Sequence, residues 1–292
     1  MTVLVTGGSG QLAAALAAHP GMAVIGRPGF DFDRPETITP ALAAARPTLV
    51  VNAAAYTAVD AAETDAAAAF RANRDGPAAI AAWCRDAGVP LIHISTDYVF
   101  DGTKGAPYLE TDPAAPLGVY GASKHAGERA VLESGARAVI LRTSWVYASR
   151  GRNFMLTMLS AGARMPRLRV VADQIGCPTT ALDLAAAVAA VAGRIAAGWR
   201  EEYAGITHAA GSGHSSWHGF ATAIFAEAAA FGGPTPEVEA IATADWPTPV
   251  RRPADSRLDC TRLDGVFGVR LPDWRDGLRR TVAAWAAART RR

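Results

Sequence analysis

Residues 2–13 read TVLVTGGSGQLA, and this stretch decides the fold. An apolar run over residues 3–5 leads directly into a glycine-rich turn, and an alanine-rich helical pattern follows. This order of strand, turn and helix is the context that a dinucleotide-binding fingerprint requires. Gly7 permits the tight turn, Gly10 lets a pyrophosphate approach the backbone, and Ala13 stands at the packing position, where alanine is tolerated. The stretch therefore predicts the first unit of a dinucleotide-binding α/β fold.

The rest of the first half repeats the alternation of strand and helix. Apolar runs predict further strands at residues 22–26, 48–51, 91–95 and 138–142. Helical patterns lie between them at residues 40–46, 66–87 and from 119 to 128. Continuous apolar strands that alternate with helices are typical of buried parallel strands, so we predict a Rossmann-like, doubly wound parallel sheet. Ligands bind at the carboxyl ends of such strands, and Thr96 is therefore expected at the same rim as the glycine turn.

The second half is less regular. Helices are predicted at residues 153–163, 180–197, 216–231 and 275–289, and strands at residues 168–171, 206–209 and 237–242. A serine at position 215 or 216 is expected to cap the third of these helices. No clear linker separates the two halves. We therefore expect a dinucleotide-binding domain over residues 1–147 and a smaller, interleaved C-terminal lobe over residues 148–292 that mainly binds substrate, with residues of about 180–200 returning to the sheet.

Composition excludes several classes of function. Half of the 292 residues are hydrophobic, which predicts a buried core, and the net charge of +2 argues against a nucleic-acid surface. No apolar run is long enough to span a bilayer, and residues 2–5 read as a strand rather than a signal peptide, so we expect a cytoplasmic protein without membrane contact. The three cysteines lie far apart and do not show the spacing of a metal site. His214 and His218 stand four residues apart, and we interpret them as part of a helix start rather than as metal ligands.

Tyr120 and Lys124 stand four residues apart in a predicted helix and so share one face. A nearby ammonium is expected to lower the pKa of a phenol, which could then exchange a proton with a carbonyl or alcohol oxygen. This spacing is common by chance. It becomes persuasive here because a dinucleotide fold precedes it.

Arg27 leaves the choice of cofactor open. A site that prefers NAD commonly has an acidic residue at the end of the second strand, whereas an arginine there can accept the 2′-phosphate of NADP. We therefore favour NADPH over NADH, with a solvated turn arginine as the equally weighted alternative. Asp31 and Phe32 follow where a carboxylate and an aromatic ring could flank adenine.

Several motifs together resemble a known family. TGGSG at residues 6–10, STDYVFDG at residues 95–102 and the pair Tyr120 and Lys124 resemble the extended short-chain dehydrogenases/reductases. Longer motifs resemble more narrowly the dTDP-4-dehydrorhamnose reductase family: NAAAYTAVDAAE at 52–63, RTSWVY at 142–147, NF at 153–154, DQIGCPT at 173–179 and RRPADSRL at 251–258. The resemblance runs from residue 1 to about residue 280.

The resemblance implies reduction of the 4-keto group of dTDP-4-dehydro-L-rhamnose to dTDP-L-rhamnose by NADPH or NADH. Tyr120 would donate the proton, Lys124 would bind the nicotinamide ribose and tune Tyr120, and Thr96 would bond the reacting carbonyl. The implied cofactor contacts are Gly7, Ser9, Gly10, Gln11, Leu12, Arg27, Asp31, Phe32, Ala53, Ala54, Ala55, Tyr120 and Lys124. The implied substrate contacts are Thr96, Asp97, Trp145, Asn153 and Arg252.

The resemblance leaves the metal site, the assembly state and the exact reaction open. Some members of the family bind magnesium through glutamates at a dimer interface, but Leu182 stands at one such position, so we predict no such metal site. A homodimer remains an open expectation. Arg251 and Arg252 could neutralise a diphosphate or form a solvated loop. The alternatives to the reductase are another sugar-nucleotide ketoreductase or an epimerase of this superfamily, or a catalytically silent regulatory homologue.

Overall fold

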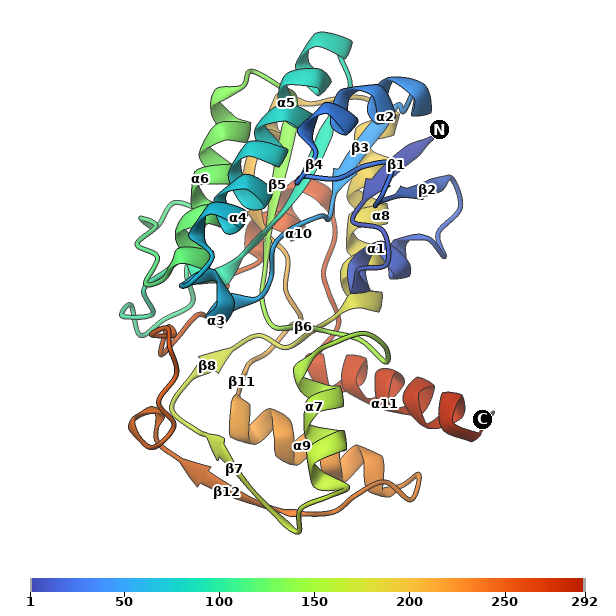
Figure 1. The fold of residues 1–292 in the computed structure, drawn as a ribbon. Coiled ribbons are helices and arrows are strands. Elements are labelled where there is room, and N and C mark those ends of the chain that lie inside the picture. Colours follow the sequence, from blue (N-terminus) through green and yellow to red (C-terminus); the bar gives the residue numbers. More distant parts are fainter. Residues whose placement is uncertain (1, 291–292) are drawn as a thin grey trace.

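A parallel sheet of six strands forms the centre of the computed structural model, which describes residues 2–290 (Figure 1). The strand order is β10–β5–β4–β3–β1–β2, and all neighbouring strands are parallel. The bounds are β1 Val3–Thr6, β2 Met22–Ile25, β3 Leu49–Asn52, β4 Leu91–Thr96, β5 Ala138–Thr143 and β10 Gly205–His208. The predicted strands of the first half are confirmed to within one residue at each end. The register pairs Thr6 with Asn52 and Thr96 with Thr143, so neighbouring strands end at one rim.

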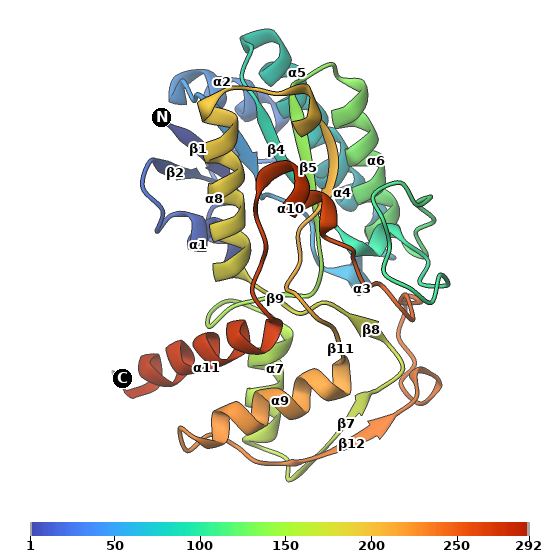
Figure 2. The same ribbon diagram turned by 180° about the vertical axis from the view of Figure 1, so that it is seen from behind.

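Helices cover both faces of the sheet, which confirms the doubly wound arrangement (Figures 1 and 2). One face packs against α1 Gln11–Leu16, α8 Ala181–Ala197 and α10 Thr261–Phe267. The other face packs against α2 Ile38–Ala45, α5 Gly76–Ala87 and α6 Val119–Glu133. Both layers are dominated by fully buried aliphatic side chains, as expected for strands buried on two sides. The helix that carries Tyr120 and Lys124 is thus held against the sheet by a continuous core.

The second half contributes both to the sheet and to a second lobe. Strand β10 and helices α8 and α10 join the sheet layers, whereas the lobe lies beyond the end at which β5 continues into β6 (Figure 1). The elements of the lobe and its border are β6 Val146–Tyr147, α7 Phe154–Gly162, β7 Arg167–Val171, β8 Ile175–Gly176, β9 Thr179–Thr180, β11 Ser215–Ser216, α9 Trp217–Ala229, β12 Glu237–Ile241 and α11 Trp274–Thr290. Its core includes Phe220 and Trp274. Ser216 caps α9 by accepting the backbone N–H of Gly219 at 3.0 Å, as predicted.

One predicted helix is interrupted. The pattern at residues 66–87 forms α4 Ala66–Phe70, a π-helical segment Arg71–Asp75 and then α5. The π-helical segment carries Asn73, whose buried side chain bonds Ser123 on α6 and both backbone groups of Tyr56. A π-helical turn adds a residue to the helix and so re-aims the neighbouring side chains, an irregularity that hydrophobic periodicity does not encode. Its effect here is to join α6 to the chain that follows β3.

Gly127 allows a test of the close approach between α6 and the π-helical segment. A Cβ at Gly127 would overlap the Asn73 carbonyl oxygen, because the backbones of α6 and the π-helical segment lie in contact. We expect Gly127→Ala to destabilise the fold by about 2 kcal/mol or more, since overpacking against backbone cannot relax through a rotamer. Thermal or urea unfolding would measure it. The control is Gly193→Ala on α8, where nothing lies within 4 Å of the added carbon and helix propensity predicts a gain of about 1 kcal/mol. Equal stability of the two variants would contradict the packing account.

Candidate functional site

The glycine turn is shaped for close approach of a ligand to backbone. Gly7 has φ of +114°, and a Cβ there would lie 3.0 Å from the Ala53 carbonyl group, so the turn rests directly on the end of β3. Gly10 is the N-cap of α1, and among the described residues this helix end has no side-chain cap. The first N–H groups of α1 are therefore uncapped by side chains, as a phosphate-binding turn requires. These features fit the pyrophosphate of a dinucleotide.

The predicted cofactor contacts fall into two sets. Gly7, Ser9, Gly10 and Ala55 are exposed or half-buried at the rim, together with Ala53 and Ala54. The side chains of Leu12 and Phe32 are core residues instead: Leu12 packs between the sheet and α8, and Phe32 covers Gly76, where a Cβ would lie 2.5 Å from the ring. The Phe32 ring is thus packed against α5, and its expected contact with the cofactor stays a prediction.

A hydrogen-bonded row ties the ends of three neighbouring strands together. The Thr6 hydroxyl donates to Asn52 Oδ1 at 2.6 Å, and Asn52 Nδ2 lies 3.0 Å from His93 Nδ1. Asn52 Oδ1 also accepts the Ala54 backbone N–H at 3.2 Å. All three side chains of the row are buried. Burial, together with the nearby Lys124, places the pKa of His93 well below its ordinary value, so this imidazole is neutral. The row fixes the rim on which the cofactor segment 53–55 sits.

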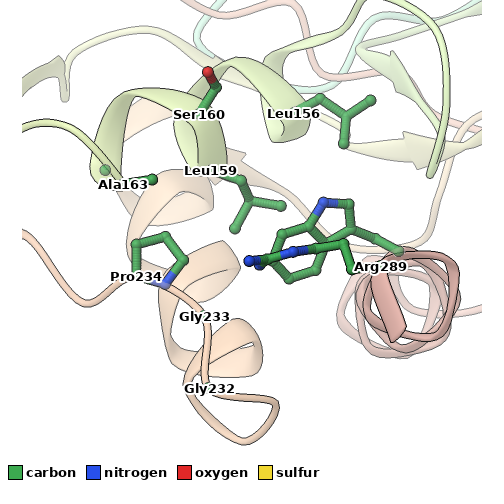
Figure 3. Close-up of a pocket in the computed structure, with 10 residues that line it drawn as sticks. Leu156, Leu159, Ser160, Ala163, Gly232, Gly233, Pro234 and Arg289 are labelled. Carbon is green, nitrogen blue, oxygen red and sulfur yellow. The ribbon is translucent and has the colours of Figure 1, made fainter. Parts of the chain in front are cut away.

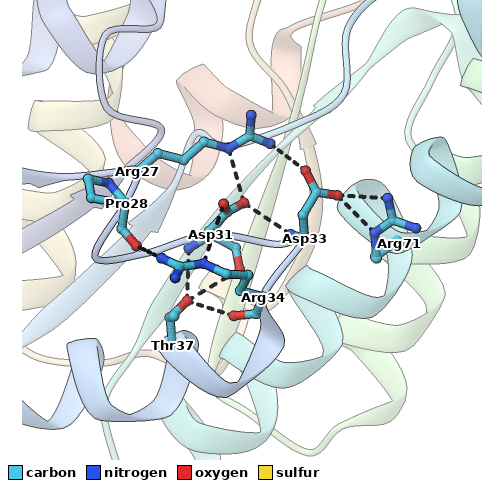
Figure 4. A network of polar contacts seen from close by, with 7 residues as sticks. All are labelled: Arg27, Pro28, Asp31, Asp33, Arg34, Thr37 and Arg71. Atoms are coloured by element: carbon cyan, nitrogen blue, oxygen red, sulfur yellow. Dashed lines mark hydrogen bonds and ion pairs between the residues drawn. The ribbon is translucent and has the colours of Figure 1, made fainter.

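Arg27 belongs to an exposed ionic network beyond the end of β2 (Figure 4). Its guanidinium donates to Asp31 Oδ1 at 3.0 Å and to Asp33 Oδ2 at 2.8 Å. The other oxygen of Asp33 accepts two bonds from Arg71, at 2.9 and 2.7 Å. Arg34 lies on the same network, within 4.0 Å of Asp31. Arg27 is thus already paired with two carboxylates, and Asp31 is an ion-pair partner as well as a candidate ribose ligand.

The three predicted catalytic residues come together at the end of β4. The Tyr120 phenol shares a hydrogen bond with the Thr96 hydroxyl. Thr96 donates to Asp97 Oδ1 and accepts the Tyr98 backbone N–H, both at 3.2 Å. Lys124 is 2% exposed, and its Nζ donates to the Ile94 carbonyl oxygen at 2.6 Å. One turn of α6 therefore places a phenol and an amine over the last residues of one strand, β4.

The pKa values of this cluster differ from the sequence-based expectation. Burial raises the pKa of Tyr120 to about 12, against the opposing hydrogen bond from Thr96. Burial lowers the pKa of Lys124 to about 8, and the negative charge of Glu128 opposes that shift. The expected lowering of the Tyr120 pKa by Lys124 is therefore wrong in direction for this arrangement, because desolvation outweighs the charge of an amine that faces a carbonyl. Tyr120 is protonated at neutral pH and can act as an acid.

Asp97 lies behind Thr96 rather than at the surface. It is 2% exposed, and its Oδ2 accepts hydroxyl bonds from Ser144 at 2.9 Å and Ser256 at 2.6 Å. Burial raises the pKa of this carboxyl group to about 6, although the hydroxyl donors oppose the shift. Asp97 thereby links β4 with the chain after β5 and with the C-terminal segment 253–258. Its carboxylate orients Thr96, which differs from the direct sugar contact expected from the sequence.

The remaining predicted substrate residues differ in their surroundings. Trp145 has a φ of +47° and stacks on Trp217 with ring centroids 3.4 Å apart, at the border of the two lobes. Asn153 is an N-cap: its Oδ1 accepts from Leu156, and its Nδ2 donates to Gln11 Oε1 at 2.8 Å. The amide therefore has a structural role at the start of α7, and its expected contact with the sugar stays a prediction. The bond from Asn153 also gives Gln11 a structural role, because it connects the glycine turn with the start of α7.

Arg252 reaches back to the first domain. Its Nη2 bonds both oxygens of Asp60 on α3 Val59–Ala62, at 3.2 and 3.0 Å, and its buried Nε has no hydrogen-bond partner within residues 2–290. The charge of Arg252 also acts on the nearby Tyr98, whose ring centroid lies 5.9 Å from that of Tyr120. Arg252 therefore borders the cluster, whereas Arg251 is exposed. Trp246 is 52% exposed.

A hollow of about 500 Å³ lies elsewhere, in the second lobe (Figure 3). It is lined by α7, by residues 232–234 and by α11, with Leu159, Trp285 and Arg289 around it. None of the predicted site residues lines it. Among the described residues, no group of three or more His, Cys, Asp or Glu side chains is arranged to hold a metal ion. The same residues include no helix long and apolar enough to cross a membrane.

Sequence reasoning missed the polar groups that support the cluster. Ser95 and Glu128 bond each other at 2.5 Å, and Glu128 also forms a buried ion pair with Arg142 of β5. The sequence did contain an indication of these groups, because Ser95 and Arg142 interrupt otherwise apolar strands. An arginine inside a buried strand requires an acidic partner, and only the packing of α6 shows which one.

Comparison with known proteins shows a full-length similarity. A family model described as "RmlD substrate binding domain" matches residues 1–287. A Sinorhizobium fredii protein named dTDP-4-dehydrorhamnose reductase is 46% identical over 290 residues, covering 98% of this chain and 97% of its own. A Streptomyces antibioticus protein named probable dTDP-4,6-dihydroxy-2-methyloxan-3-one 4-ketoreductase is 40% identical, covering 96% and 94%. The solved dTDP-4-dehydrorhamnose reductase of Bacillus anthracis, in complex with NADP, has a TM-score of 0.87 and 32% identity, covering 97% of this chain and 100% of that chain.

Proposed function

Because the chain belongs to the RmlD substrate binding domain family, we propose that it is an NAD(P)H-dependent reductase of the 4-keto group of dTDP-4-dehydro-L-rhamnose, which yields dTDP-L-rhamnose. The observation that carries the proposal is the cluster of Thr96, Tyr120 and Lys124 at the strand rim that also bears the glycine turn. A phenol with a high pKa is a suitable acid for a carbonyl oxygen that gains charge during reduction.

The residues of the chain then have distinct roles. The nicotinamide cofactor supplies the hydride when it is bound at the glycine turn and the 53–55 segment. As negative charge grows on the C4 oxygen of the sugar, Tyr120 donates its phenolic proton to that oxygen, and the Thr96 hydroxyl stabilises it. Before substrate binds, the Thr96 hydroxyl donates to Asp97 at 3.2 Å, and in the reaction it would turn its single proton from this carboxylate to the C4 oxygen. Lys124, as an ammonium, stabilises the phenolate that remains on Tyr120.

Two further residues are proposed to contact the substrate. Trp145 is half-buried just after the end of β5, has a left-handed backbone conformation and stacks on Trp217 at the border of the two lobes. Arg252 has a guanidinium fork that suits a diphosphate, and its partner Asp60 is itself partly exposed. We propose that Arg252 holds the diphosphate of the dTDP-sugar while it remains anchored to α3 through Asp60.

The direct test is reduction of enzymatically prepared dTDP-4-dehydro-L-rhamnose, followed by the loss of nicotinamide absorbance with NADPH and then with NADH. Formation of dTDP-L-rhamnose supports the proposal. If neither cofactor is consumed, the silent regulatory homologue becomes the better account. The similarity to a 4-ketoreductase of another dTDP-deoxysugar favours one alternative, which comparison of the two keto-sugars as substrates would distinguish. An epimerase would instead retain bound NAD after purification and consume no reduced cofactor.

For the cofactor, we propose that NADPH is preferred through Arg27. This side chain is 70% exposed and lies beyond β2, where it can turn toward a 2′-phosphate, but Asp31 and Asp33 compete for it. We expect Arg27→Ala to weaken NADPH binding roughly tenfold, the scale of a lost charged hydrogen bond, and to leave NADH binding nearly unchanged. Fluorescence titration with each nucleotide would measure both. Arg200→Ala serves as the control, because Arg200 is an exposed arginine near β10, the edge strand opposite β2. Equal losses for the two nucleotides would rule out a role at the 2′ position.

A further inference from the structure

Glu128 has no place in the reaction as described, yet it is fully buried on the helix that carries Tyr120 and Lys124. Its Oε1 accepts the Ser95 hydroxyl at 2.5 Å. Its two carboxylate oxygens accept Nε and Nη2 of Arg142 at 2.8 and 2.7 Å. One side chain of α6 therefore reaches both β4 and β5, the central strands that end at the catalytic rim.

Side chains of α6 also contact the two neighbours of Ser95 on β4, Ile94 and Thr96. Lys124 bonds the carbonyl of Ile94, and Glu128, one helical turn later, bonds the side chain of Ser95. The next residue of β4 is Thr96, which shares a hydrogen bond with Tyr120. Three consecutive strand residues are thus engaged by three side chains spaced along one face of α6. A slip of the helix along the strand would break all three contacts at once.

We propose that Glu128 is a positioning residue for the reaction: its carboxylate locks α6 to β4 and β5, so that Tyr120 and Lys124 are held in reach of Thr96. This proposal rests on the proposed reductase function. Glu128 touches neither substrate nor cofactor in it. The ion pair with Arg142 supplies the rigidity, because a bidentate guanidinium–carboxylate contact in a dry interior defines a geometry more tightly than a single bond.

The same carboxylate has an electrostatic consequence. The titratable or charged groups around Lys124 are Tyr120 and Glu128 on α6, His93 on β4 and Arg142 on β5, with His125 lying 3.4 Å from Glu128. His93 is neutral, and Arg142 is already paired with Glu128. The Glu128 carboxylate is therefore the nearby negative charge that keeps a buried amine protonated.

The first test is Ser95→Ala, which removes the bond between Glu128 and β4 but leaves the buried ion pair intact. We expect kcat to fall roughly tenfold through misplacement of the cluster, with KM, nucleotide affinity and melting temperature nearly unchanged. The matched control is Thr281→Val, which removes a buried hydroxyl bonded to Thr180 in the second lobe, far along the chain from the cluster. It should lose no kcat.

The second test is the double variant Glu128→Gln with Arg142→Met, which removes both charges because an unpaired buried partner would destabilise the fold. We expect nucleotide binding and turnover to decline, at high pH, roughly one pH unit lower than in the wild type. Wild-type kcat in Ser95→Ala, or an unmoved basic limb in a folded double variant, would overturn the proposal. Nucleotide binding is followed by fluorescence without substrate. If the wild type shows no turnover but the double variant still shifts the pH dependence of nucleotide binding, the proposed reaction is rejected. The role of Glu128 in positioning Tyr120 and Lys124 is then retained.

Discussion

Replacing Tyr120 with phenylalanine should lower kcat by roughly 10²-fold or more, the usual scale for loss of a positioned general acid. The variant keeps the ring, and with it the edge contact to Tyr98 at 5.9 Å between centroids. It removes only the hydroxyl that shares a hydrogen bond with Thr96. Binding of NADPH and the melting temperature should therefore change little, so that the loss lies in the chemical step. Steady-state kinetics with saturating cofactor would measure it.

The neighbouring tyrosine supplies the control for this experiment. Tyr98→Phe removes another buried phenol of the same ring pair, whose pKa burial raises above its ordinary value. No proton transfer is assigned to it, and kcat should stay within about threefold of the wild type, since a lost ordinary hydrogen bond contributes little. A kcat of Tyr120→Phe close to that of Tyr98→Phe would remove Tyr120 from the mechanism.

The second large effect concerns Lys124. Replacement by alanine should lower kcat by roughly 10²-fold or more, because the phenolate left on Tyr120 would lose its stabilising charge. The pH dependence of wild-type activity shows whether the charged form of Lys124 is the active one. Burial lowers the pKa of Lys124 to about 8, whereas Tyr120, with a pKa of about 12, stays protonated through this range. On the basic side of the profile, activity should therefore decline as the pH rises through about 8.

A pH series of kcat and kcat/KM for the wild type and for Lys124→Arg would check this assignment. Arginine stays charged throughout the range, so any activity that the variant retains should show no basic limb near pH 8. A wild-type profile that stays flat as the pH rises well past this value would contradict the account. So would a limb that persists unchanged in Lys124→Arg, because the titrating group would then lie elsewhere.

The secondary structure and the rim were predictable because they depend on local rules. An apolar run followed by TGGSG can scarcely form anything but a strand and tight turn, and the later strands repeat that apolar pattern. Since parallel strands end at one rim, the proximity of Thr96 to the glycine turn followed from their order alone. The spacing of Tyr120 and Lys124 required only the helical period.

Features that the sequence did not show have another origin. The ring of Phe32 packs on Gly76, and the amide of Asn153 caps α7. The direction of the Tyr120 pKa shift was wrong, because the sequence shows the nearby lysine and does not show the depth of burial. Burial and hydrogen-bond partners depend on segments distant in the chain, and no local pattern records them.

By itself, the sequence determined the order of strands and helices, the glycine turn, and which residues share the catalytic face of α6. It could do so because each follows from the residue periodicity and from the geometry of parallel sheets. Only the tertiary structure decided that Glu128 joins Ser95 to Arg142, that Asp97 lies behind Thr96, and that burial sets the proton affinity of the cluster. These depend on long-range packing, where desolvation and the choice of polar partner are decided by contacts between distant parts of the chain.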